Sequence, residues 1–152
     1  MTTQTQKQIS VLTLSTLAFT ACFAVWMMFA IIGIPIKKML GLNETEFGIL
    51  VATPVLTGSL IRLPLGMWTD KLGGRIVFFI LMLATVIPIW LIGYATEYWH
   101  FLLLALFVGV AGGSFSVGIA YVARWFPKQR QGFAMGIFGA GNSGAALTKF
   151  VA

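Results

Sequence analysis

The sequence predicts an all-α integral membrane protein that crosses the bilayer five times. Hydrophobic residues make up 59% of its 152 residues and charged residues only 9%, with a mean hydropathy of +0.94. A soluble domain carries about 25% charged residues. A spanning helix needs roughly 20 apolar residues. The intervals between charged residues leave five segments of that length, at 10–34, 47–69, 75–96, 99–123 and 131–152.

The first span contains no charged residue between Lys7 and Lys37. Its apolar run is about twice as long as the core of a signal peptide, and no small-residue cleavage site ends it early. We therefore expect an anchor that stays in the mature protein. Cys22, the one cysteine of the chain, permits no internal disulfide, and we expect a small buried packing residue there.

The second span contains a charged residue, Arg62, eight residues before Asp70. At about 1.5 Å per residue, Arg62 lies roughly 12 Å from the cytoplasmic end of its helix. An arginine at that depth costs from about 2.5 to more than 10 kcal/mol. Snorkelling towards the headgroups or a structural ion pair could offset this cost. Because no carboxylate lies within a predicted span, an anion from outside the chain is the favoured partner.

The fourth and fifth spans place two more side chains at a similar depth. Phe115 lies nine residues before Arg124, about 13 Å from the same membrane face, and Asn142 lies twelve residues after Arg130, about 18 Å from it. Transporter substrate sites lie near the midplane. Depth does not show that the side chains converge. Ordinary packing for Phe115 and an interhelical hydrogen bond for Asn142 are the alternatives.

The fifth span is rich in glycine around Asn142, in the stretch GAGNSGAALTK. Glycines such as Gly141 and Gly144 let membrane helices touch, let a rocking transporter bend and let a small ligand approach the backbone. Packing alone explains the glycines but not the amide. Lys149 shares the helical face of Asn142 but lies about 28 Å from the cytoplasmic end. We favour snorkelling for Lys149, with attraction of anions into an outward-open cavity as the alternative.

This combination of side chains suits a small planar oxyanion. A guanidinium presents two parallel donors in a fork, an amide adds further donors, and a ring face stacks on a flat, delocalised ion. Nitrate and nitrite are flat, small and monovalent. Phosphate is bulkier and more highly charged, and it would require more cationic groups than these spans contain.

The net charge of +6 follows from membrane topology rather than from nucleic-acid binding. Only Lys37 and Lys38 fall in loops on one side of a five-helix path, beside Glu44, Glu46 and Glu97. The positive-inside rule therefore places the N-terminus and the opposite loops in the cytoplasm. The cationic residues on that cytoplasmic side are Lys7, Lys71, Arg75, Arg124, Lys128 and Arg130.

The cytoplasmic turn GMWTDKLGGR, residues 66–75, is the most specific pattern in the chain. Its two consecutive glycines permit a tight reversal, and its basic residues hold it inside. A carboxylate at a helix boundary can accept backbone N–H bonds or pair with the arginine that ends the fourth span. A generic charged turn is the alternative. The residues that we expect to act in gating are Gly66, Asp70, Lys71, Gly74, Arg75 and Arg124.

This turn resembles the signature loop between helices 2 and 3 of the major facilitator superfamily. RWFPKQRQGFAMGIFGAGNSGAA (124–146) resembles the helix 4–5 region and the glycine-rich nitrate signature of the nitrate/nitrite porter family. GSLIRLPLG (58–66) resembles the helix 2 segment with that family's substrate arginine, and GGSFS (112–116) resembles its helix 4 stretch with an aromatic ring over the anion.

The resemblance implies a specific fold and site. The family has two six-helix halves that alternate access to a central site. Residues 1–152 would be the N-terminal part of such a domain, truncated in helix 5, and the second substrate arginine would belong to the missing C-terminal half. The substrate residues that the resemblance implies are Arg62, Phe115 and Asn142, with Gly141 and Gly144 in the signature.

The main hypothesis is therefore a multi-pass nitrate/nitrite transporter of the bacterial cytoplasmic membrane. The alternatives are a porter for another small anion, or a membrane sensor or scaffold without transport. The sequence contains no nucleophile paired with a base, no metal cluster and no phosphate loop, so we expect neither an enzyme nor a cofactor. Because no carboxylate or histidine lies within the spans, nitrate/nitrite exchange is weakly favoured over proton symport.

Overall fold

In the part that its computed structural model describes, the protein consists of helices joined by short turns and loops. That part is the backbone of residues 3–151 and the side chains of residues 3–146, 148 and 149. It confirms the predicted all-α membrane fold. The helices, with 3₁₀ segments named η, are α1 (Thr3–Leu40), α2 (Glu44–Leu72), α3 (Gly74–Ile92), α4 (Tyr98–Val108), η1 (Gly109–Gly113), α5 (Ser114–Trp125), α6 (Lys128–Gly139), η2 (Ala140–Ser143) and α7 (Gly144–Val151).

Four helices in the described part of the chain are long and apolar enough to cross a membrane. They are α1, α2, α3 and the continuous run Tyr98–Trp125, which comprises α4, η1 and α5. The predicted span at 131–152 is not among them. It begins earlier, at Lys128, and η2 interrupts its α-helix. The same glycines and Asn142 that suggested a site lower the hydropathy of this segment.

The first two helices extend beyond the predicted spans because their ends are chemically suited to a helix. The helix-forming Gln and Lys residues before Ile9 continue α1 towards the N-terminus. At its other end, Lys37 and Lys38 complement the helix dipole. Asn43 and Glu46 form a capping box at the start of α2, with each side chain accepting a bond from the other's backbone N–H, at 2.9 and 3.0 Å.

The turn between α2 and α3 is tighter than predicted. A single residue, Gly73, separates the two helices, with a φ of +86° that favours glycine. Gly74, which we expected to serve the reversal, is already the first residue of α3. A Cβ there would lie 2.2 Å from the Tyr121 ring. Gly74 therefore permits close contact between α3 and α5.

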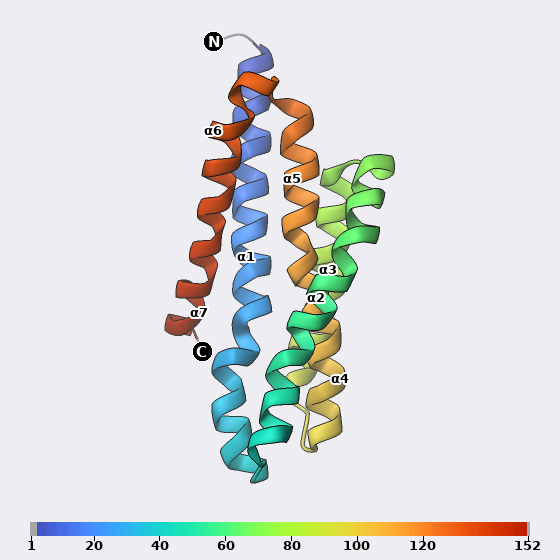
Figure 1. The fold of residues 1–152 in the computed structure, drawn as a ribbon, viewed down its shortest axis with the longest axis vertical. Coiled ribbons are helices and arrows are strands. Elements are labelled where there is room, and N and C mark those ends of the chain that lie inside the picture. Colours follow the sequence, from blue (N-terminus) through green and yellow to red (C-terminus); the bar gives the residue numbers. More distant parts are fainter. Residues whose placement is uncertain (1–2, 152) are drawn as a thin grey trace.

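The helices run up and down, with α1 beside the α6–η2–α7 segment and beside α5 (Figure 1). The start of α1, the α2–α3 turn and the α5–α6 loop lie towards one end of the molecule. The α1–α2 turn and the start of α4 lie at the other end. Most of the basic residues lie in helix turns at the first of these two ends.

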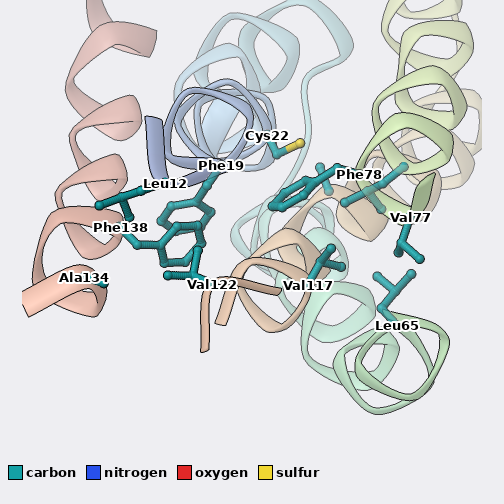
Figure 2. Packing of buried hydrophobic residues seen from close by; sticks show 12 residues of the cluster. Leu12, Phe19, Cys22, Leu65, Val77, Phe78, Val117, Val122, Ala134 and Phe138 are labelled. Atoms are coloured by element: carbon teal, nitrogen blue, oxygen red, sulfur yellow. The ribbon is translucent and has the colours of Figure 1, made fainter. Parts of the chain in front are cut away.

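The larger core cluster contains residues of α1, α2, α3, η1, α5 and α6 (Figure 2). Phe19 of α1 stacks on Phe138 of α6, with ring centroids 4.7 Å apart. Gly118 of α5 makes room for this pair, because a Cβ there would lie 1.9 Å from the Phe138 ring. Large apolar side chains cover the outward faces, such as Leu63, which is 79% exposed, as lipid-facing positions require.

Candidate functional site

Arg62 of α2 is half-buried and lies between two aromatic rings. Its Cζ is 5.8 Å from the centroid of the Phe115 ring and 5.9 Å from that of the Trp26 ring, both within cation–π range. Its Nε is buried without a hydrogen-bond partner. Among the described residues no carboxylate forms an ion pair with it. The guanidinium therefore carries a charge at bilayer depth with no counter-charge in this part of the chain.

Phe115 packs in the core, as one interpretation of the sequence expects, and it also lies beside Arg62; its contact with a substrate stays a prediction. It lies in the first turn of α5, directly after the glycine-rich η1. Its ring faces Arg62 and also packs on Phe19 and Phe138, at centroid distances of 5.6 and 6.2 Å. The approach of α2 to η1 explains this position, because a Cβ at Gly113 would lie 2.3 Å from Leu65.

Trp26 of α1 completes this group, and sequence reasoning missed it. Its indole Nε1 donates a 2.9 Å hydrogen bond to the Pro54 carbonyl of α2. The indole occupies a notch between Gly58 and Gly112, where an added Cβ would lie 2.8 and 2.7 Å from it, respectively. Tryptophan usually sits at the membrane interface, so an indole within a span was the available signal.

Asn142 is not joined to this group by any contact between described residues. It lies in η2, and its side chain is exposed. Its role as a substrate ligand stays a prediction. The break in the helix at Ala140–Ser143 nevertheless coincides with the predicted signature.

Gly141 and Gly144 lie at the contact between this segment and α1. Both are buried. A Cβ at Gly141 would lie 2.5 Å from the Phe19 ring, and one at Gly144 would lie 2.2 Å from the Thr20 carbonyl oxygen. Thr148 of α7 also donates a 2.9 Å hydrogen bond to an α1 carbonyl. Helix packing accounts for both glycines, and their contact with a substrate stays a prediction.

The ion pair expected between Asp70 and Arg124 is present at one end of the molecule. Arg124 Nη2 lies 2.9 Å from Asp70 Oδ1 and donates a second bond, of 3.0 Å, to the Asp70 carbonyl. These bonds join the last turn of α2 to the last turn of α5. Both side chains are about half exposed, so the pair contributes at most about 1 kcal/mol to stability.

The remaining residues predicted to act in gating differ in their surroundings. Lys71 and Arg75 are exposed on either side of the one-residue turn. A Cβ at Gly66 would meet nothing within 4 Å, whereas Gly74 packs against Tyr121. Lys149 is exposed on α7, as both snorkelling and anion attraction require.

Comparison with known protein families matches residues 14–148 to the Major Facilitator Superfamily. The chain belongs to the major facilitator superfamily. It is also 51% identical over 144 residues to the "Probable nitrate/nitrite antiporter NarK1" of Thermus thermophilus, a match that covers 95% of this chain and 32% of the relative. The superfamily match and the four apolar helices together indicate a multi-pass membrane protein.

Two other curated relatives match nearly the same region. The "Probable nitrate transporter NarT" of Staphylococcus carnosus is 36% identical over 141 residues. The "Nitrite extrusion protein" of Bacillus subtilis is 33% identical over 141 residues. Each alignment covers 93% of this chain and 36% of the relative. The chain thus spans about a third of the length of these transporters.

Proposed function

We propose that this chain is the N-terminal part of a nitrate/nitrite transporter that works by alternating access. The observation that carries the proposal is the half-buried guanidinium of Arg62, held between two rings and without a counter-charge among the described residues. The curated relatives of this chain carry names that refer to nitrate or nitrite transport or extrusion. They support nitrate and nitrite over other small anions, and transport over a sensor or scaffold role.

The chemistry of the site suits these ions. The guanidinium fork donates two parallel hydrogen bonds to a planar oxyanion. The Phe115 ring offers a flat apolar face beside the fork, which favours a flat, weakly hydrated ion over a bulky tetrahedral one. The rest of the site, including a second cation, comes from the remainder of a longer chain. Asn142 approaches the anion when the two halves close.

The transporter lies in the bacterial cytoplasmic membrane with its N-terminus in the cytoplasm. Basic residues lie in the terminal turns of the helices at one end of the molecule, and the positive-inside rule places that end in the cytoplasm. The Asp70–Arg124 ion pair then closes the cytoplasmic side in one state of the cycle. Lys71 and Arg75 hold the neighbouring turn at the headgroups.

Nitrate/nitrite exchange is the coupling mode that the residues favour. Proton carriers in membranes are typically carboxylates or histidines buried within the spans. The four acidic residues of this chain, Glu44, Glu46, Asp70 and Glu97, lie in the first or last turns of helices or at a cap. Nitrate uptake driven by a pH gradient without internal nitrite would contradict exchange.

Uptake into proteoliposomes tests the proposal directly. The complete transporter is reconstituted with nitrite inside, and the initial rate of nitrate uptake is compared with that of its Arg62→Lys variant. Lysine keeps the charge but loses the fork, so we expect saturable uptake in the parent and at least a tenfold loss of kcat/KM in the variant, or about 1.4 kcal/mol.

Arg130→Lys is the matched control, because Arg130 is exposed at the start of α6 and the substitution is the same. Equal loss in both variants would indicate a general effect of the substitution. Equal uptake by the parent and Arg62→Lys would make Arg62 structural. Without uptake in the parent, the proposed function fails.

A further inference from the structure

The Trp26 indole is fixed at a junction of three helical segments. Its N–H is bonded to the Pro54 carbonyl of α2, and its ring fills the notch between Gly58 of α2 and Gly112 of η1. Any larger residue at either glycine would overlap the indole. The ring also packs on Phe23, with centroids 5.4 Å apart. Its orientation is therefore restrained on several sides.

This fixed ring is one of the two walls that flank the Arg62 guanidinium. The other wall, Phe115, is itself held by contacts with Phe19 and Phe138. The two walls come from different helices, and their centroids are nearly equidistant from the Arg62 Cζ, at 5.9 and 5.8 Å. An arginine side chain otherwise has many rotamers, so two rigid rings restrict the directions in which its fork can point.

We propose that Trp26 is a positioning residue that holds the Arg62 guanidinium against Phe115, in the orientation that receives the anion. The inference rests on the proposed function and adds a third residue, on a third helix, to the group that determines affinity. Trp26 acts through Arg62 rather than on the anion. The Pro54 hydrogen bond fixes the indole, and the indole restrains the guanidinium before substrate arrives.

The first test measures nitrate uptake by the complete transporter with Trp26→Leu and Trp26→Phe. Leucine removes the ring and the N–H donor, and we expect KM for nitrate to rise about fivefold with kcat nearly unchanged. Phenylalanine keeps a ring but loses the bond to Pro54, and we expect a smaller rise. A purely structural role would lower the amount of active transporter, and hence the maximal rate, without raising KM.

Trp68→Leu is the matched control. Trp68 lies on α2, one and a half turns beyond Arg62, and is 52% exposed. The Trp68→Leu variant loses the same kind of side chain, but Trp68 does not belong to the group of Trp26, Arg62 and Phe115, so the KM of this variant should equal that of the parent. Gel filtration of each variant reports whether it remains folded and monodisperse.

The second test needs no nitrate. Phenylglyoxal modifies accessible arginines, and mass spectrometry of the peptides gives a separate rate for each one. Without the Trp26 ring, Arg62 should react severalfold faster, whereas Arg124, in the last turn of α5, should react at the parent rate. This readout remains valid if the parent does not transport nitrate, so the proposed function can fail while the role of Trp26 is still decided.

Each combination of results decides the inference. A raised KM together with faster modification of Arg62 supports it. A raised KM with unchanged modification would show that Trp26 acts on the anion directly, and would overturn the positioning role. Faster modification with an unchanged KM would show that restraint of Arg62 has no consequence for binding. If Trp26→Leu does not fold, Trp26→Phe must show the same changes at smaller size, or the inference is wrong.

Discussion

The contact between α7 and α1 predicts that Gly144→Ala destabilises the protein. An added Cβ would lie 2.2 Å from the Thr20 carbonyl oxygen and 3.1 Å from the Ala24 backbone nitrogen. Real Cβ contacts essentially never fall below 3.0 Å, so the two backbones must separate by about 0.8 Å or more. Neither backbone can rotate away as a flexible side chain would. Overpacking of this kind costs about 1–3 kcal/mol.

Thermal unfolding of the complete transporter in detergent measures this effect. We expect the midpoint of Gly144→Ala to fall by several degrees. Gly136→Ala is the matched control, because Gly136 lies in the same glycine-rich segment and an added Cβ there meets nothing within 4 Å. Alanine is also the better helix former. Equal midpoints for the two variants would refute the reasoning about this contact.

The same variant separates packing from substrate contact at Gly144. If Gly144 serves only the contact with α1, the folded fraction of Gly144→Ala should retain the parent KM for nitrate. A rise in KM at unchanged stability would instead favour the substrate role that the nitrate signature implies.

Two further predictions concern α5. Asp70→Asn weakens the ion pair with Arg124, whose side chains are both about half exposed, so the free energy of unfolding should change by less than about 1 kcal/mol. A cysteine introduced at the cytoplasmic end should become more accessible to a thiol reagent, because the cytoplasm-open state gains population. Unchanged accessibility and uptake kinetics would exclude a gating role. Gly118→Ala would place a Cβ 1.9 Å from the Phe138 ring, which should cost about 1–3 kcal/mol in thermal unfolding; a parent-like midpoint would contradict this.

The sequence could predict the similar depth of Arg62 and Phe115, because their helices end at charged residues on the same side. Asp70 and Arg124 form an ion pair, so they mark one common level. Counting eight and nine residues back from that level reaches similar depths on α2 and α5. That the two faces converge depends on helix rotation, which a count along the chain does not contain.

The same reasoning could not find Trp26, because a count along α1 from its charged N-terminal end does not give a similar depth for Trp26. Its nearest N-terminal charge is Lys7, and α1 begins at Thr3. Nineteen residues separate Lys7 from Trp26, which corresponds to roughly 28 Å. That estimate places the indole far deeper than Arg62. A count along α1 therefore does not place Trp26 beside Arg62, although the two side chains meet.

The pattern of apolar and glycine residues also could not predict the 3₁₀ segments η1 and η2. Glycine-rich stretches such as GVAGG and AGNS are compatible with a continuous helix, a kink or a tighter turn. Tertiary contacts decide among them. At η1 the decisive contact is with α2, where Gly109 approaches the Pro54 backbone. The pattern of apolar residues does not indicate that α2 packs against this stretch.

The ion pair and the aromatic contact of Arg62 join the same two helices. Asp70 and Arg62 are both on α2, and Arg124 and Phe115 are both on α5. The two helices are thus connected twice, about two turns apart. A tilt of one helix about either connection lengthens the other connection, so the two together favour movement of α2 and α5 as one unit.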